Sequence, residues 1–94
     1  MNKEFKLWLN LSAKIQENKV DLICPKCNKK DIDYIYVGDI NSRIGFMEVW
    51  CNSCLYGIHI SRVKIPNASK MFSFDITSSD FEKHVPKFKH IVPS

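Results

Sequence analysis

Apolar side chains recur at helical spacing over residues 3–18, which predicts an amphipathic N-terminal helix. The inward-facing stripe consists of Phe5, Trp8, Leu9, Ser12 and Ile15, with Leu11 beside it, and the opposite arc carries Lys3, Lys6, Asn10, Lys14 and Glu17. The segment has neither Gly nor Pro, and Asn18 suits its C-terminal end. An isolated helix of this length is marginal in water, so we expect its stripe to pack on a sheet.

After residue 21 the pattern changes to short apolar runs, which predict β-strands. These runs cover residues 32–37, 44–50 and 56–65, and the segment 38–43 between the first two has turn chemistry. In the third run the apolar positions change parity between Ile60 and Val63. This change of phase, near Ser61 and Arg62, predicts a β-bulge or a change of packing partner.

The last third of the chain has weaker patterns. Residues 71–74 fit a short strand, residues 79–82 fit a capping box that opens a short helix, and Pro86 ends that helix. An irregular tail is expected after it, anchored by Phe88, Ile91 and Val92. We therefore expect one domain over residues 1–94, with the helix in 1–20, the sheet in 21–66 and a C-terminal extension with a short strand and helix in 67–94.

Four cysteines stand in two C-x2-C pairs, Cys24 with Cys27 and Cys51 with Cys54, separated by 23 residues. The 94 residues are 45% apolar and 26% charged, which is typical of a globular chain. So short a chain builds a marginal core and commonly adds a metal, a disulfide or a partner. Zinc favours four tetrahedral thiolates, and a C-x2-C turn presents two of them from one tight loop. The spacing therefore predicts one zinc ion bound by all four cysteines.

Two other interpretations of the cysteines remain open. A redox pair at Cys24 and Cys27 would need a helix N-terminus within a βαβ unit, whereas the residues after Cys27 lead into a strand. Disulfides suit secreted chains, but the N-terminus has no apolar run and no cleavage site of a signal peptide. No segment has the roughly 20 apolar residues that span a bilayer. We therefore expect a cytoplasmic protein without a membrane partner. In such a protein, zinc binding is the favoured role of the four cysteines.

The motifs CPKC at 24–27 and CNSC at 51–54, with a hairpin between them and a strand after, resemble the zinc-ribbon fold group over about residues 22–65. The resemblance implies a small α+β fold, with a three-stranded antiparallel sheet and two zinc knuckles, here flanked by the N-terminal helix. Many ribbons have glycine at positive φ directly after a knuckle. Asn28, which tolerates that conformation, follows the first knuckle. Leu55 follows the second, with Gly57 two residues later, which predicts a turn that differs in detail.

The zinc ion is expected to be structural, and an enzyme is not expected. Four thiolates close the coordination shell, whereas a catalytic zinc keeps one position open for water. His59, His84 and His90 form no H-E-x-x-H motif, and we interpret His59 as a strand-face residue and the other two as solvated. Asp31 and Asp33 are interpreted as exposed edge residues. The sequence has no phosphate-binding glycine loop or Ser-centred elbow, so no small-molecule substrate is expected.

Two kinds of partner remain. The formal charge of +4 falls to about +2 when four thiolates and one Zn²⁺ are counted, so charge alone does not imply nucleic acid. The chain has two Trp, six Phe and three Tyr, and an exposed aromatic patch would serve a protein partner or a homodimer. Nucleic acid is the alternative, bound through Tyr34, Tyr36 and Tyr56 with Lys26, Lys29, Lys30, Lys83, Lys87 and Lys89. Trp8 is assigned to the core, and Trp50 is expected to shield the zinc site.

Overall fold

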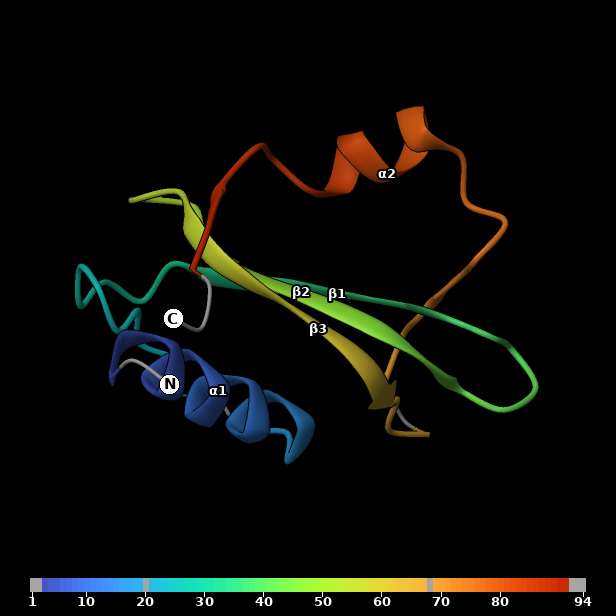
Figure 1. Ribbon diagram of the computed structural model, residues 1–94, viewed down its shortest axis with the longest axis horizontal. Helices are drawn as coiled ribbons and strands as arrows, with labels where there is room; N and C mark the ends of the chain where they lie inside the picture. The colour runs from blue at the N-terminus through green and yellow to red at the C-terminus, as the bar shows by residue number, and fades with distance from the viewer. Residues whose placement is uncertain (1–2, 20, 68, 92–94) are drawn as a thin grey trace.

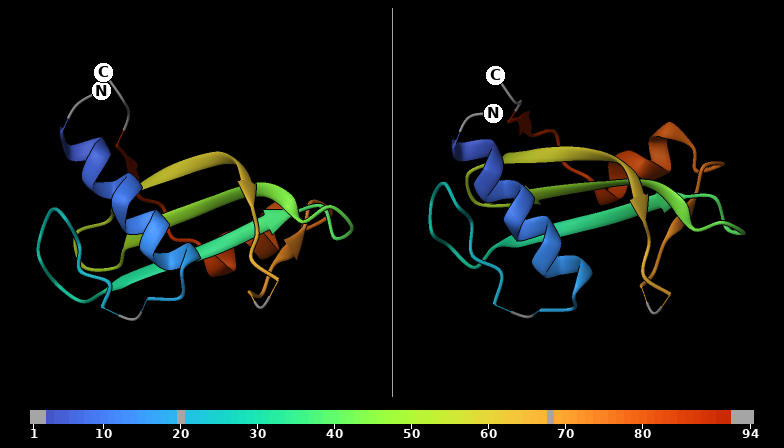
Figure 2. Two further views of the ribbon diagram at one scale, coloured as in Figure 1. Left: turned by 90° about the horizontal axis from the view of Figure 1, so that it is seen from below. Right: turned by 60° about the horizontal axis from the view of Figure 1, so that its bottom comes forward.

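The chain folds into three layers, a helix, a sheet and a C-terminal segment, in the computed structural model, which describes residues 3–19, 21–67 and 69–91 (Figure 1). The elements are α1 (Lys3–Gln16), β1 (Ile32–Gly38), β2 (Ile44–Cys51), β3 (Tyr56–Lys64), β4 (Phe72–Ser73), α2 (Ser78–His84) and β5 (Lys89–His90). The five strands form one sheet in the order β4-β1-β2-β3-β5. Helices α1 and α2 lie on opposite faces of it, as the turned views of Figure 2 also show. The fold is therefore a small α+β fold, as predicted.

Helix α1 has the predicted apolar stripe and ends where the sequence indicates. Trp8, Leu11, Ser12 and Ile15 are its buried residues. Asn18 has a φ of 61°. The Asn18 N–H donates to the carbonyl of Ile15 at 3.0 Å, and the Lys19 N–H donates to that of Lys14 at 3.0 Å. These two bonds form a Schellman motif, which satisfies carbonyls that the helix end would leave unpaired.

Strand β2 is the centre of the sheet, and its alternating side chains separate two cores. It pairs antiparallel with β1 and with β3. Met47, Val49 and Cys51 lie in the core that contains the stripe of α1, and each is 0% exposed. The members of this front core are Trp8, Leu11, Ile15, Cys24, Tyr36, Met47, Val49, Cys51, Ile58, Val63, Ile65 and Ile91. Trp8 is fully buried among them, which confirms its assignment to the helix–sheet interface.

The bulge expected near Ser61 and Arg62 is present in β3. Phe46 pairs with Ser61 and Gly45 pairs with Val63, so Arg62 is the extra residue. Arg62 has a φ of 56°, the left-handed conformation that accommodates one inserted residue. Because of the bulge, Val63 enters the same front core as the residues before it. The apolar phase therefore changes without a change of packing partner.

The C-terminal third contributes both edge strands, so the expected three-stranded antiparallel sheet is in fact a mixed five-stranded one. Strand β4 lies parallel to β1 and strand β5 lies parallel to β3. The expected strand at 71–74 is present as Phe72–Ser73, but the tail expected to be irregular contains β5. Strand β5 has two residues, too few for the alternation that identifies a strand in a sequence.

The anchors and the cap of this last third are close to the expected ones. Ile91 is buried in the front core and Phe88 packs on the opposite one, whereas Val92 lies outside the described residues. The cap of α2 is Thr77, two residues before the predicted Ser79, and its hydroxyl accepts from the Asp80 N–H at 3.2 Å. The capping-box position was therefore wrong, although a short helix follows.

Trp50 does not shield the thiols, contrary to expectation. It belongs to a second, back core on the α2 side, made of Ile35, Val37, Trp50 and Val85 with Phe46, Phe72, Ile76, Phe81 and Phe88 packed against it. Its ring stacks on that of Phe88, with centroids 5.9 Å apart, and its Nε1–H donates to Asn52 at 2.9 Å. Successive strand residues point to opposite faces, so Trp50 and Cys51 cannot share one side of the sheet.

Candidate metal centre

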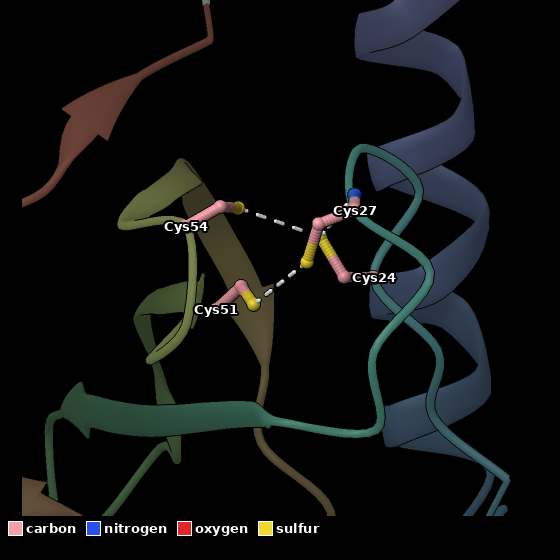
Figure 3. A group of neighbouring side chains, drawn as sticks. All are labelled: Cys24, Cys27, Cys51 and Cys54. Atoms are coloured by element: carbon pink, nitrogen blue, oxygen red, sulfur yellow. Dashed lines mark hydrogen bonds between the residues drawn. The ribbon is translucent and has the colours of Figure 1, made fainter.

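Two loops bring the four cysteines together at one end of the sheet (Figure 3). The first loop, at 24–27, lies between α1 and β1, and the second, at 51–54, joins β2 to β3. The register of the sheet holds the second loop beside the start of β1, because Ile32 pairs with Cys51 and the Asn52 N–H donates to the Asp31 carbonyl at 2.9 Å. The predicted convergence of the two loops is therefore achieved.

The sulfur atoms have the spacing of a tetrahedral metal site. The Cys24 and Cys54 Sγ atoms are 3.7 Å apart, and those of Cys27 and Cys51 are 3.6 Å apart. All four sulfurs lie within 4.8 Å of one another. Zinc–sulfur bonds of 2.3 Å give a tetrahedron with edges of about 3.8 Å. A disulfide would require about 2.05 Å, and all four cysteines are free. The group can hold a metal ion.

Both loops use the same backbone turn. Asn28 has a φ of 64° and Leu55 a φ of 55°, directly after the second cysteine of each loop. The Asn28 N–H donates to the Cys24 carbonyl, and the Leu55 N–H donates to the Cys51 carbonyl, each at 2.9 Å. The role of Asn28 is thus confirmed, whereas the expected difference at Leu55 was wrong. Gly57 serves close packing instead, because a Cβ there would lie 2.1 Å from the Val49 carbonyl oxygen.

The surroundings of the individual thiols shift their pKa values in opposite directions. Burial raises the pKa of Cys24 from its usual value, and it raises the pKa of Cys54 to about 12. A hydrogen bond from the backbone of Lys29 lowers the pKa of Cys27. The N–H groups of Lys26 and Cys27 point at the Cys24 sulfur, at 3.3 and 3.4 Å. Buried thiolates need a compensating cation, which a bound metal supplies.

The lysines of the two predicted clusters partly converge beside this centre. The Lys26 ammonium lies 4.2 Å from the Tyr56 ring centroid, and that of Lys89 lies 5.8 Å from it. Lys26 also pairs with Glu4 on α1 at 3.1 Å, and this hydrogen bond raises the pKa of Lys26. Lys83 instead pairs with Asp80 on α2 at 3.6 Å.

Two of the three tyrosines, Tyr34 and Tyr56, are at least partly accessible to a ligand. Tyr34 is 40% exposed and Tyr56 is half-buried, whereas Tyr36 is 1% exposed. Burial raises the pKa of Tyr36 to about 12. Tyr36 therefore belongs to the core and is not available to stack on a base.

Of the remaining candidate residues, Asp31 contacts the second cysteine loop. Asp33 is exposed, and Asp31 accepts a hydrogen bond from Ser53 at 2.6 Å. The His84 ring packs at a tilt against that of Phe72, with centroids 4.8 Å apart. His59 and His90 both approach the buried Glu48, a grouping that sequence reasoning missed. The only signal was a lone carboxylate at an otherwise apolar point of β2.

Comparison of this chain with protein-family models, curated proteins and solved structures finds no match. Within residues 3–19, 21–67 and 69–91, no helix is long and apolar enough to cross a membrane.

Metal binding at the thiols is expected to release protons. Because burial raises the pKa values of Cys24 and Cys54, both are protonated at neutral pH without metal, and a metal must displace those protons. We predict that loading at neutral pH releases at least the two protons of Cys24 and Cys54 and that metal affinity falls as the pH falls. Calorimetry in buffers of different ionisation enthalpy measures the number. Affinity that is unchanged between mildly acidic and mildly alkaline buffer would contradict thiolate ligation.

Proposed function

We propose that this chain is a zinc-ribbon domain whose single Zn²⁺ ion, held by Cys24, Cys27, Cys51 and Cys54, is structural. The observation that carries the proposal is the tetrahedral spacing of the four sulfurs, 3.6 and 3.7 Å across the two loops. Four thiolates leave no coordination position for water or substrate, so this centre has a structural rather than a catalytic role.

The first loop supports a structural role for the metal. The residues between α1 and β1 include no helix or strand in the described part of the chain, yet Cys24 is 0% exposed within the front core. Zinc would tie this loop to the second loop and thereby fix it between α1 and the sheet. Structural zinc sites contribute on the order of 10 kcal/mol or more of apparent binding free energy, which becomes folding free energy.

Removal of the metal is expected to unfold the domain. We predict that the purified protein contains one zinc per chain by elemental analysis, and that a strong chelator or Cys51→Ser abolishes its cooperative thermal transition. The control is Ser53→Ala in the same loop, which removes the hydrogen bond to the Asp31 carboxylate and should cost at most about 3 kcal/mol. Iron in place of zinc, or an unchanged transition in the chelated protein, would refute a structural zinc site.

We further propose that the domain acts as a non-enzymatic interaction module. Leu7 on α1 and Ile23 before the first loop are 43% and 44% exposed. They line a hollow of about 540 Å³ between the helix and that loop, together with Asn10, Leu11, Lys14, Cys24, Pro25 and Asn28. Two large aliphatic side chains exposed beside one hollow are typical of a protein-docking surface, for a second copy or another protein.

This surface can be tested by charge substitution. We predict that Leu7→Glu with Ile23→Glu abolishes a self-association seen by sedimentation, or the capture of a partner by the tagged protein. Ile40→Glu is the matched control, because Ile40 is 66% exposed in the β1–β2 turn, at the other end of the sheet. Equal loss with the control, or binding that survives the double substitution, would exclude the hollow as the docking surface.

Nucleic acid is a second candidate partner, favoured by the lysines around Tyr56. Lys26 comes from the first loop and Lys89 from the last strand, yet both ammonium groups approach one half-buried ring. The Tyr56 ring borders a hollow of about 390 Å³, and Lys87 also lines it. The lining residues are Cys54, Leu55, Tyr56, Lys87, Phe88 and Lys89. Lysines interleaved with aromatic rings form the kind of surface that binds single strands.

The salt dependence of binding tests this candidate. We predict salt-sensitive binding of a labelled single-stranded oligonucleotide. Lys87→Ala with Lys89→Ala should lower the log–log salt slope by about 1.4, since each phosphate contact on a single strand contributes about 0.7. Lys64→Ala with Lys70→Ala removes the same charge from the opposite end of the sheet and serves as the control. Equal effects of the two pairs would indicate diffuse attraction, and no binding at low salt would remove the candidate.

A further inference from the structure

The excess positive charge of the chain is confined to its first 30 residues. This segment contains seven lysines against three carboxylates, whereas residues 31–94 contain seven basic and seven acidic side chains. The N-terminal segment therefore accounts for the whole formal charge of +4. The two negative charges of a zinc tetrathiolate would not cancel this excess, so this end of the molecule stays positive.

The fold places part of this charge around the hollow between α1 and the first loop. Figure 3 shows that loop running alongside the helix. Lys14 lines the hollow, and Lys3 is exposed on the same helix face, because residues 3, 7, 10 and 14 have the spacing that aligns side chains along a helix. Lys29 is exposed on the loop, and its carbonyl accepts from the N–H of Cys24, another lining residue, at 3.0 Å. Positive charge therefore borders the hollow from both the helix and the loop.

The carboxylates of the N-terminal segment do not balance this rim. Glu4 pairs with Lys26 at 3.1 Å, so its charge is already compensated. Glu17 and Asp21 come after the end of α1 and are not among the residues that line the hollow. A negatively charged partner is therefore attracted to this surface, most strongly at low salt.

The apolar part of the surface favours a protein segment as that partner. Leu7 and Ile23 are aliphatic and 43% and 44% exposed, and no aromatic ring lines the hollow among the residues that the structure describes. Single-stranded nucleic acids bind by stacking bases on aromatic rings, which this surface does not offer. A second copy is disfavoured as well, because a symmetric dimer would bring the same lysines of the two copies together.

We propose that the hollow binds an acidic protein segment, which inserts aliphatic side chains beside Leu7 and Ile23. Its carboxylates then face Lys3, Lys14 and Lys29. This partner class rests on the docking function proposed for the same hollow and specifies the charge of the occupant. Desolvated apolar anchors mainly determine how slowly such a complex dissociates, whereas charges at the rim mainly determine how fast it forms.

Selection from a displayed library of random peptides tests the chemistry of the partner. The full chain, purified in the presence of Zn²⁺, is immobilised, and the enriched peptides are sequenced and then measured individually by association and dissociation kinetics. We expect the enriched peptides to combine an excess of Asp and Glu with at least a pair of Leu, Ile or Val residues. Their binding should weaken as the salt concentration rises.

Two pairs of substitutions separate the anchors from the rim. Leu7→Glu with Ile23→Glu should abolish binding of the selected peptides. Lys3→Ala with Lys14→Ala should lower the association rate constant about tenfold at low salt and leave the dissociation rate constant nearly unchanged. Because both lysines are exposed, this second pair keeps the test valid if the glutamate variant does not fold.

The outcomes distinguish failure of the acidic partner from failure of the hollow. Lys64→Ala with Lys70→Ala removes the same charge at the opposite end of the sheet and should leave the association rate constant unchanged. Peptides that need Leu7 and Ile23 but carry no excess of negative charge would overturn the acidic partner and leave the docking hollow in place. Peptides that bind the double-glutamate variant equally well would overturn both. Absence of any enriched peptide, or equal effects of the two lysine pairs, would also overturn the acidic partner.

Discussion

The approach of four sulfur atoms to within 4.8 Å is the constraint on which the rest of the arrangement depends. It joins a loop that follows α1 to the turn that links β2 and β3. Cys24 and Cys51 are also members of the front core and are 0% exposed, alongside Trp8 and Leu11. The candidate metal centre and the packing of the helix therefore share one core. A change in sulfur spacing would displace the loop that leads from the helix into the sheet.

The opposite face of the sheet depends on the C-terminal third. Phe81 of α2 and Val85, directly after that helix, cover it, and Phe88 stacks on Trp50. The chain reaches this face by adding β4 at one edge and returns to the other edge as β5, where the Ile91 N–H donates to the Gly57 carbonyl at 2.8 Å. The segment that lay outside the family resemblance is thus what buries the second apolar face of the sheet, which water would otherwise contact.

Features that depend on interactions between neighbouring residues could be predicted from the sequence, whereas features that depend on pairing of distant segments mostly could not. Local signals sufficed for the helix and its end at Asn18, the bulge at Arg62 and the turn at Asn28, because each depends on a few neighbouring residues. The spacing of the C-x2-C pairs also sufficed to bring the sulfurs together. A short strand was expected at 71–74, where β4 lies, but strand β5 and the parallel pairing of both edge strands were not predictable, since parallel pairing of two residues leaves no periodic pattern. The error over Trp50 was avoidable, because its parity already differs from that of Cys51.

Strand β2 explains how one small sheet can keep a thiol and a buried carboxylate apart. Glu48 and Cys51 are three residues apart, an odd separation, so their side chains point to opposite faces. The four thiols lie together on the α1 side, whereas Glu48 lies beside His59 and His90 on the other side. An apolar residue at position 48 would satisfy the back core at lower cost, because burial of a charge opposes folding. Glu48 is accommodated there beside His59 and His90, whose nitrogens lie 3.1 and 3.5 Å from its two oxygens.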